Sequence, residues 1–450
     1  MTPAAGAPQG RRFSVAQLAL LAPWVALVIG AWSTITDNSF LWHIRSGTLQ
    51  IEEGTVLTAD PFSFTRGGEE WVTQSWLVEL LFGWAESVDD LSFVPLSILV
   101  VGGLTFLGIG VISYRFSKSA SATAFVLVLG VLTLITFFVP RPVIYSYLLM
   151  VLVMMAWDRS ESRWAVPLLF WIWASVHGSF VIGLAYVGLA LVMHREWREV
   201  PKALVAGLVT LFTAHGLGAV TFLFDFAESR DALQYLTEWR RPGLDDLIFI
   251  PYLGTLLFCV IGFARRKVPL QFLWLFVPFA VLGFTSVRAL PPAWLGLLPV
   301  VSLSFVGLEI GTRAGLRQRL AAIYASFVLV MPFLLAEGAT ISEERFPTRA
   351  VSALEQVNTF HDDRVGGYLI WAEWPEQQVY IDDRAELYSD RMGEFVRVRR
   401  GDPEWRAVFE RDGIQQALLA NTEPLIRDLT DAGWDRAYTD QYFTVLRPMG

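Results

Sequence analysis

The strongest constraint on the fold of this chain is a series of long apolar runs, each close to the length that crosses a bilayer. A full crossing takes about 20 apolar residues, and tilted or paired helices deviate from that length. Only 17% of the residues are charged, against about 25% in soluble domains, and the mean hydropathy is +0.46. We therefore predict an all-α polytopic membrane domain of about eleven transmembrane helices over residues 16–338. The runs lie at 16–34, 93–113, 121–139, 143–157, 164–176, 179–193, 203–224, 247–264, 268–286, 290–308 and 320–337.

One boundary in this series is open, because His177-Gly178 interrupts the apolar sequence between 164 and 193. The segment is either one long helix or a tight hairpin of two short helices. Cytoplasmic loops accumulate Lys and Arg, and with a hairpin every second connection holds two or three basic residues, including all three lysines. The positive charge therefore favours the hairpin. It also predicts that residues 1–15 are a cytoplasmic tail and that the C-terminal end lies outside.

Residues 339–450 are more polar, and we predict that they form a soluble, extracytoplasmic α/β domain. The chain has 43 acidic and 35 basic residues, and the whole excess of acid lies after residue 339. An acidic surface excludes nucleic acid as a partner, because phosphate backbones need a basic one. We expect a helix near 348–357, strands at "RVGGYLIW" and "QVYID", a helix at "EWRAVFERDG" ended by Gly413, and a closing strand at "YFTVLRP".

Residues 35–92 form a first outer loop that is far longer than the two to eight residues usual between helices, and long ordered loops are commonly functional. Asn38 or Ser39 can cap a helix that Gly54 ends. We expect this helix, "FLWHIRSGTLQIEE", to lie on the membrane surface and to turn its apolar side chains mostly to lipid. These side chains are Leu41, Trp42, Ile44, Leu49 and Ile51. An extended segment with a Gly-Gly turn follows, and then a second short helix, "SWLVELLFGWAES".

Several motifs resemble those of one group of membrane proteins. They are "WHIR", "DPFSFT", "GGEEW" and "SWLVE" in the first outer loop, "WIWASVHGSF" and "EWRRP" in the membrane part, and "GGYLIW" with "VYIDDRAELY" in the tail. Over nearly its full length the chain resembles a group of bacterial polytopic proteins placed in the glycosyltransferase C (GT-C) superfamily. Its first outer loop is distantly similar to that of archaeal oligosaccharyltransferase catalytic subunits, which carry an Asp-aromatic-His/Asn-x-Arg helix followed by Gly and Asp-Pro.

The resemblance implies a GT-C-like fold in the bacterial cytoplasmic (inner) membrane. It implies transfer of a sugar from a polyprenyl phosphate or diphosphate lipid, on the outer face, to a glycan, lipid or protein acceptor. It further implies that an acid near the end of the first span activates the acceptor, and the best matches are Asp37 and then Asp60. The chain departs from the family at Ser39, where an acid is expected four residues before His43. No DxD pair occurs in the membrane part, so no cofactor or metal ligand is assigned, and use of Mg²⁺ or Mn²⁺ stays open.

The proposed chemistry gives a reason for these residue types. Transfer from a lipid phosphate needs a carboxylate to deprotonate the acceptor hydroxyl and cationic donors to stabilise the departing phosphate. Each acid also has a plain structural alternative. Asp37 could stabilise the N-terminal dipole of a helix, and Asp60 could be a turn acid before a proline.

Arginine is scarce on the predicted outer side of the membrane, yet several arginines stand at the outer ends of different spans. We predict that a subset binds the donor phosphate through the bidentate guanidinium fork that lysine lacks. The candidates are Arg45, Arg141, Arg288 and one of Arg240 or Arg241. Snorkelling to lipid headgroups is the alternative for each of them taken singly.

Three further side chains are candidates for the same site. His43 could bind a phosphate oxygen or the acceptor, Glu79 could face a cavity rather than the headgroups, and His177 is an ionisable group within an apolar run. Ordinary polar contacts between helices are the alternative for the histidines. Two other functions compete with transfer: a transporter or flippase of a lipid-linked substrate, which inverted repeats would favour, and a non-catalytic scaffold whose acidic outer domain binds a partner.

Overall fold

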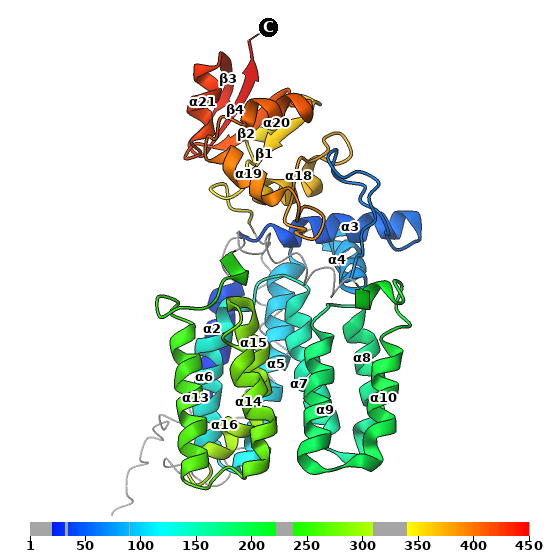
Figure 1. The fold of residues 1–450 in the computed structure, drawn as a ribbon, viewed down its shortest axis with the longest axis vertical. Helices are drawn as coiled ribbons and strands as arrows, with labels where there is room; N and C mark the ends of the chain where they lie inside the picture. The colour runs from blue at the N-terminus through cyan, green and yellow to red at the C-terminus, as the bar shows by residue number, and fades with distance from the viewer. Residues whose placement is uncertain (1–19, 32–34, 90, 222–236, 309–339, 450) are drawn as a thin grey trace, which may run out of the picture.

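A computed structural model describes residues 20–31, 35–89, 91–221, 237–308 and 340–449 of the chain. The molecule is mostly helical, with a long helical bundle at one end and a small α/β domain at the other (Figure 1). The two helices of the first outer loop lie between these parts. The predicted cytoplasmic tail at 1–15 and the predicted span at 320–337 lie outside the described residues.

The bundle contains the apolar runs as helices of unequal length. They are α2 (Ala22–Ala31), α5 (Phe93–Ser117), α6 (Ala120–Leu134), α7 (Val143–Trp157), α8 (Val166–Ala174), α9 (Phe180–His194), α10 (Val200–Val209), α13 (Phe249–Ala264), α14 (Leu273–Leu282), α15 (Leu290–Gly296) and α16 (Leu298–Ser304). Within the described residues, α5 and the helix Ala120–Phe137 are each long and apolar enough to cross a membrane alone. The pair Val287–Gly296 and Leu298–Ser304 meets the same criterion together and is bent by 59°. The other apolar helices are shorter.

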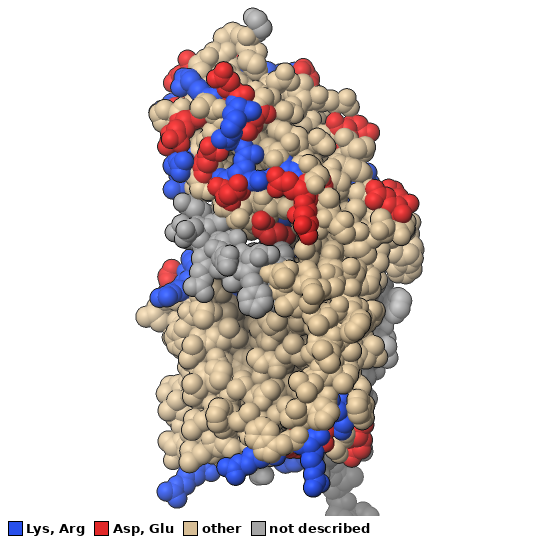
Figure 2. Space-filling view, turned by 45° about the vertical axis from the view of Figure 1, so that its right-hand side comes forward, with Lys and Arg blue, Asp and Glu red and all other residues tan. Residues whose placement is uncertain are grey.

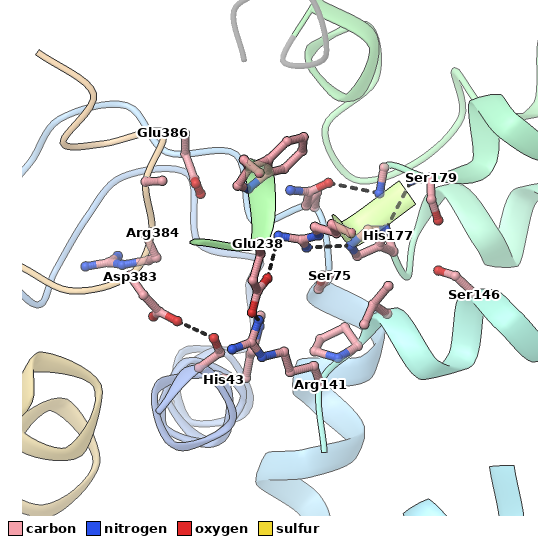
Figure 3. Close-up of a pocket in the computed structure, with 18 of the residues that line it drawn as sticks. His43, Ser75, Arg141, Ser146, His177, Ser179, Glu238, Asp383, Arg384 and Glu386 are labelled. Carbon is pink, nitrogen blue, oxygen red and sulfur yellow. Dashed lines mark hydrogen bonds and ion pairs between the residues drawn. The ribbon is translucent and has the colours of Figure 1, made fainter. Parts of the chain in front are cut away.

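The open boundary near His177 is a turn between two helices. α8 ends at Ala174 and α9 begins at Phe180, so the predicted hairpin of two short helices is confirmed. This turn carries His177 to the end of the bundle that faces the α/β domain (Figure 3).

Charge is distributed along the long axis of the molecule in bands. Figure 2 shows lysines and arginines gathered at the lower end of the bundle, a broad uncharged stretch above them, and mixed acids and arginines on the α/β domain. The basic residues that follow α5, α9 and α13 include Lys118, Arg195 and Arg266, all with positive φ. An uncharged belt between two charged ends is the surface expected of a membrane protein.

The first outer loop packs against protein on both sides. Its helices are α3 (Ser39–Glu53), which ends at Gly54 with φ +67° as predicted, and α4 (Trp76–Asp89). The expectation that the apolar side of α3 faces lipid is wrong for most of its side chains, because Leu41 and Ile44 are fully buried and only Ile51 is exposed. Leu41 and Ile44 belong to the hydrophobic core, and α3 packs on α4 and on a helix of the α/β domain. The predicted Gly-Gly turn is confirmed by the bridge between Ala59 and Glu70.

The α/β domain is built on a four-stranded sheet in the order β1-β2-β4-β3. β1 (Thr359–His361) and β2 (Gln416–Ala420) are parallel, whereas β4 (Phe443–Pro448) is antiparallel to β2 and to β3 (Trp434–Thr439). The helices are α18 (Asp363–Glu373), α19 (Met392–Arg399), α20 (Trp405–Arg411) and α21 (Leu425–Asp431).

The predictions for this domain are confirmed in part. α20, the turn at Gly413 (φ +63°) and the closing strand β4 are as expected. The predicted strand "RVGGYLIW" is wrong, because these residues belong to α18, whose N-terminus is capped by the side chain of Asp362. "QVYID" makes only an isolated bridge from Val379 to Ser63 of the first outer loop. The helix expected near 348–357 is a short 3₁₀ turn, η7 (Ala350–Ala353).

Helix α18 attaches the α/β domain to the first outer loop. A side chain at Gly367 would overlap the backbone carbonyl of Asn38 at the start of α3. The absence of a Cβ therefore lets the two helices approach closely enough to form one wall of the cavity described next.

Candidate functional site

A cavity of about 710 Å³ lies where the bundle, the first outer loop and the α/β domain meet. Side chains from all three parts converge on it (Figure 3). The bundle contributes Arg141, His177, Glu238 and Arg288, the first outer loop contributes Ser39, Trp42, His43 and Glu79, and the α/β domain contributes Asp363, Asp383 and Glu386. A volume of this size is typical of a site for a small molecule or for the headgroup of a larger one.

Ionisable side chains in the wall and directly beside it form a linear series, which we call the cavity chain: Asp37, Arg141, Glu238, Arg288 and His177. Nε of Arg141 lies 2.6 Å from the Asp37 carboxylate, and its Nη1 lies 2.7 Å from Glu238. Glu238 also faces Arg288 at 3.7 Å. Two arginines are thus spaced by one carboxylate, and they stand before the starts of two different helices, α7 and α15.

The last member of the cavity chain is a neutral histidine. Burial, and next the charge of Arg288, lower the pKa of His177 to about 3. Its Nε2 lies 3.3 Å from a guanidinium nitrogen of Arg288. Nδ1 of the same ring accepts from the backbone N–H of Ser179 at 3.1 Å, so the ring is held in place beside Arg288. Arg288 also lies over the ring of Trp239 at 5.3 Å, which is a favourable cation–π geometry.

The predicted pair of His43 and Glu79 is present and has well-defined partners. The Glu79 carboxylate lies 2.9 Å from Nδ1 of His43 and accepts from Ser46 at 2.7 Å and from Gln50 at 2.8 Å. Because a carboxylate accepts, Nδ1 of His43 carries a proton that points to Glu79. Glu79 therefore joins α4 to α3 and sets the orientation of His43 at the cavity wall.

Asp60 lies in a second group of charges, which we call the Arg384 cluster: Asp60, Asp382, Arg384 and Tyr388. Arg384 is fully buried and forms ion pairs with Asp60 at 2.8 Å and with Asp382 at 2.6 Å. Its guanidinium stacks on the ring of Trp71 at 4.5 Å. Burial by itself raises the pKa of Asp60, but the charge of Arg384 and the neighbouring hydrogen bonds lower it by more. The pKa of Asp60 therefore lies below its usual value. The carboxylate of Asp60 does not line the cavity.

The five predicted phosphate-binding arginines do not all converge. Arg141 and Arg288 line the cavity, whereas Arg45, Arg240 and Arg241 do not. Arg45 instead donates to the carbonyl of Trp374 at 2.9 Å and lies over its ring. Arg240 is paired with Asp246 near the surface, and Arg241 is exposed.

Asp37 is present beside the cavity, but both of its carboxylate oxygens have partners. One oxygen pairs with Arg141, and the other accepts from the backbone N–H of Phe40 at 3.3 Å. The second contact is the helix-terminus role that was the structural alternative for this acid. The wall itself includes Ser39 and Asn38 rather than Asp37.

The sequence analysis assigned no function to Asp383, one of three acids that the α/β domain contributes to the cavity. Asp383 accepts hydrogen bonds from the hydroxyl of Ser39 and from the indole nitrogen of Trp42, the latter at 2.6 Å. Asp383 and Arg384 are adjacent in sequence, but their side chains diverge (Figure 3). Glu238 was also not predicted, although it is the first residue of the motif "EWRRP".

Within the described residues, no three His, Cys, Asp or Glu side chains are arranged to hold a metal ion. The residues of the cavity therefore assign no magnesium or manganese site. No family model matches the chain, and no curated protein matches it.

Proposed function

We propose that the chain is a membrane glycosyltransferase of the GT-C type that transfers a sugar from a polyprenyl-phosphate-linked donor to an extracytoplasmic acceptor. The observation that carries the proposal is the cavity at the end of the apolar bundle that meets the α/β domain. Its wall has several carboxylates and five arginines, of which Arg141 and Arg288 come from the bundle. A donor of this class has an apolar tail, a phosphate and a sugar. Apolar helices, paired guanidinium groups and hydrogen-bonding acids are the partners that these three parts require.

Two of the arginines that line the cavity, Arg141 and Arg288, are suited to the departing phosphate. A guanidinium has five donors, and Arg288 holds its contact with Glu238 only at 3.7 Å, which leaves donors for a phosphate oxygen. Asp37 and Glu238 fix the position of Arg141 through two of its nitrogens. Donors that are held in place before the reaction stabilise a developing charge at little further cost.

The proposed topology has about eleven spans, the N-terminus in the cytoplasm and the α/β domain outside. The basic lower end of the bundle and its uncharged belt support this orientation (Figure 2). In this arrangement the cavity opens on the outer face of a bacterial cytoplasmic membrane. A reporter fused after Gly450 should then read outside, and one near Arg266 should read inside; a cytoplasmic reading at Gly450 would contradict the topology.

The transferase activity is testable without knowledge of the acceptor, because polyprenyl phosphate is released whatever receives the sugar. Full-length protein in lipid nanodiscs would be incubated with synthetic polyprenyl phosphate hexoses and with membrane extract as the acceptor source. The proposal predicts release of polyprenyl phosphate, and a strong reduction of release in the Arg141→Lys variant. The Arg240→Lys variant, changed outside the cavity, is the matched control.

Two results would contradict the proposal. If polyprenyl phosphate is released from none of the donors tested, the proposed transferase activity is wrong. Movement of the lipid-linked sugar across a vesicle membrane, with its phosphate bond intact, would instead establish a flippase.

A further inference from the structure

We propose that Asp383, which belongs to the α/β domain, is the catalytic base that takes the proton of the acceptor hydroxyl. The inference rests on the proposed transferase function and assigns one step of it. It gives the α/β domain a direct part in the chemistry.

The first argument is a local motif that occurs twice. The tripeptide Asp-Asp-Arg stands at 362–364 and again at 382–384. In both copies the first Asp accepts from the backbone N–H of the Arg two residues later, at 2.9 Å, and forms an ion pair with its guanidinium. The first Asp and the Arg therefore satisfy each other. The second Asp of each copy, Asp363 or Asp383, is left to line the cavity.

The second argument is the difference between the partners of these two acids. Asp363 has a cationic partner, Arg399, at 3.5 Å, and burial and the hydrogen bond with Asp362 raise its pKa well above the usual value although Arg399 opposes them. Asp363 is therefore tied to a second acid and to an arginine. For Asp383 the described residues provide no ion pair within 4.0 Å, and its hydrogen-bond donors are the neutral groups of Ser39 and Trp42, which fix the carboxylate in position.

The third argument compares Asp383 with Asp37, the acid that the sequence favoured. Asp37 is paired directly with Arg141 at 2.6 Å and does not line the cavity. Burial raises the pKa of Asp383, an effect that the charge of Arg141 only partly offsets. Asp383 is thus the better base of the two, and Asp37 is a residue that positions Arg141.

The step that follows can be written with all bonds and charges. The acceptor oxygen forms a bond to the anomeric carbon of the donor sugar while the bond between that carbon and the phosphate oxygen breaks. The proton of the acceptor hydroxyl passes to the Asp383 carboxylate. The electron pair of the broken bond leaves with polyprenyl phosphate, whose new charge faces Arg141 and Arg288.

The first test uses full-length Asp383→Asn in nanodiscs with the synthetic polyprenyl phosphate hexoses and membrane extract. Removal of a general base is expected to lower the rate of release by about 10²–10⁴-fold, while binding of polyprenyl phosphate persists. Asp383→Glu should recover part of the rate. Asp435→Asn, on the exposed face of β3, is the matched control and should keep the parent rate.

This design separates a failure of the Asp383 assignment from a failure of the proposed transferase function. If the parent protein releases polyprenyl phosphate and Asp383→Asn releases it equally fast, the assignment of Asp383 is wrong and the transferase function stands. If the parent protein releases none, both fail.

The second test needs no turnover. A hydrophobic carbodiimide reacts with protonated carboxyl groups in apolar surroundings, so it should modify Asp383, and polyprenyl phosphate should protect this site. Asp382 lies in the same peptide between Arg364 and Arg384 and is paired with Arg384, so it should stay unmodified. Equal labelling of both acids, or labelling of Asp383 that the lipid does not reduce, would overturn the assignment.

Discussion

The cavity chain and the Arg384 cluster contain the same kinds of side chain but differ in what surrounds them. In the Arg384 cluster the guanidinium is fully buried, meets two carboxylates and stacks on aromatic rings, although Arg384 is itself one of the residues that line the cavity. In the cavity chain two arginines share one carboxylate beside an open volume of about 710 Å³. Buried charge alone therefore does not mark a functional site. A functional cluster keeps hydrogen-bonding capacity that faces a space into which a ligand can fit.

The Arg384 cluster also has a mechanical role, because it joins sequence-distant parts of the molecule. Asp60 belongs to the first outer loop, whereas Asp382 and Arg384 belong to the α/β domain. The ion pairs between them, together with the close packing of α18 on α3, fix the domain above the bundle. Asp383 stands between Asp382 and Arg384 in the sequence, so its position in the cavity depends on this attachment.

The largest expected effect follows from breaking the Arg384 cluster. Arg384→Met would leave two buried carboxylates without their cation, and loss of one partner from a buried ion pair costs about 3–5 kcal/mol. We expect a clearly lower thermal midpoint and faster proteolysis of residues 340–449. Arg397→Met, in the exposed pair with Glu404, is the control and should change little. Equal midpoints for the two variants would refute the structural role of the cluster.

A smaller and more selective effect is expected when one acid is neutralised in each region. Asp60→Asn removes a charge-assisted contact of Arg384 and should cost about 2 kcal/mol of stability, with the affinity for donor lipid unchanged. Asp37→Asn should instead weaken the binding of donor lipid and leave the stability unchanged. In this variant Arg141 keeps Glu238 as a partner but loses part of its orientation. Thermal unfolding and lipid binding should be measured on both variants. If both lose stability, or both lose affinity for the lipid, the predicted difference between the two acids is wrong.

The pH dependence of transfer sharpens the comparison further. A base must be deprotonated to act, so the rate should rise about tenfold per pH unit below the pKa of Asp383 and level off above it. Burial raises this pKa above the usual value of about 3.9, Asp382 and Asp37 raise it further, and Arg141 opposes them; Asp363 stands in the same wall. The rise should be absent from the residual activity of Asp383→Asn, and a retained rise would point to another base.

Features with a local cause could be predicted from the sequence. Gly54 and Gly413 end helices with positive φ, and the break at His177-Gly178 separates two helices. Each depends on chemistry within a few residues. "GGYLIW" was misassigned because a short apolar run fits a buried strand as well as a helix. Its second glycine, Gly367, serves the close contact of α18 with α3, and only the tertiary structure shows that contact.

The candidate site divides in the same way. Arg141 and Arg288 were found because arginine is scarce at the predicted outer ends of the spans, and both line the cavity. Asp383 was not found, because its partner Ser39 lies 344 positions away in the sequence. The one available signal was the unexpected serine at position 39, where the resemblance predicts an acid. In the structure, a carboxylate from the other end of the chain is hydrogen-bonded to that serine.

The most direct measurement of the central claim is the affinity of the protein for a polyprenyl phosphate hexose in nanodiscs, determined for Arg141→Lys and Arg288→Lys. Both variants keep the positive charge but lose the guanidinium fork. We predict that each weakens binding by about tenfold or more, equivalent to about 1.4 kcal/mol. Arg240→Lys and Arg66→Lys, which lie outside the cavity, should bind as the parent does. Parent-like affinity in both cavity variants would contradict the assignment of this cavity as the donor site.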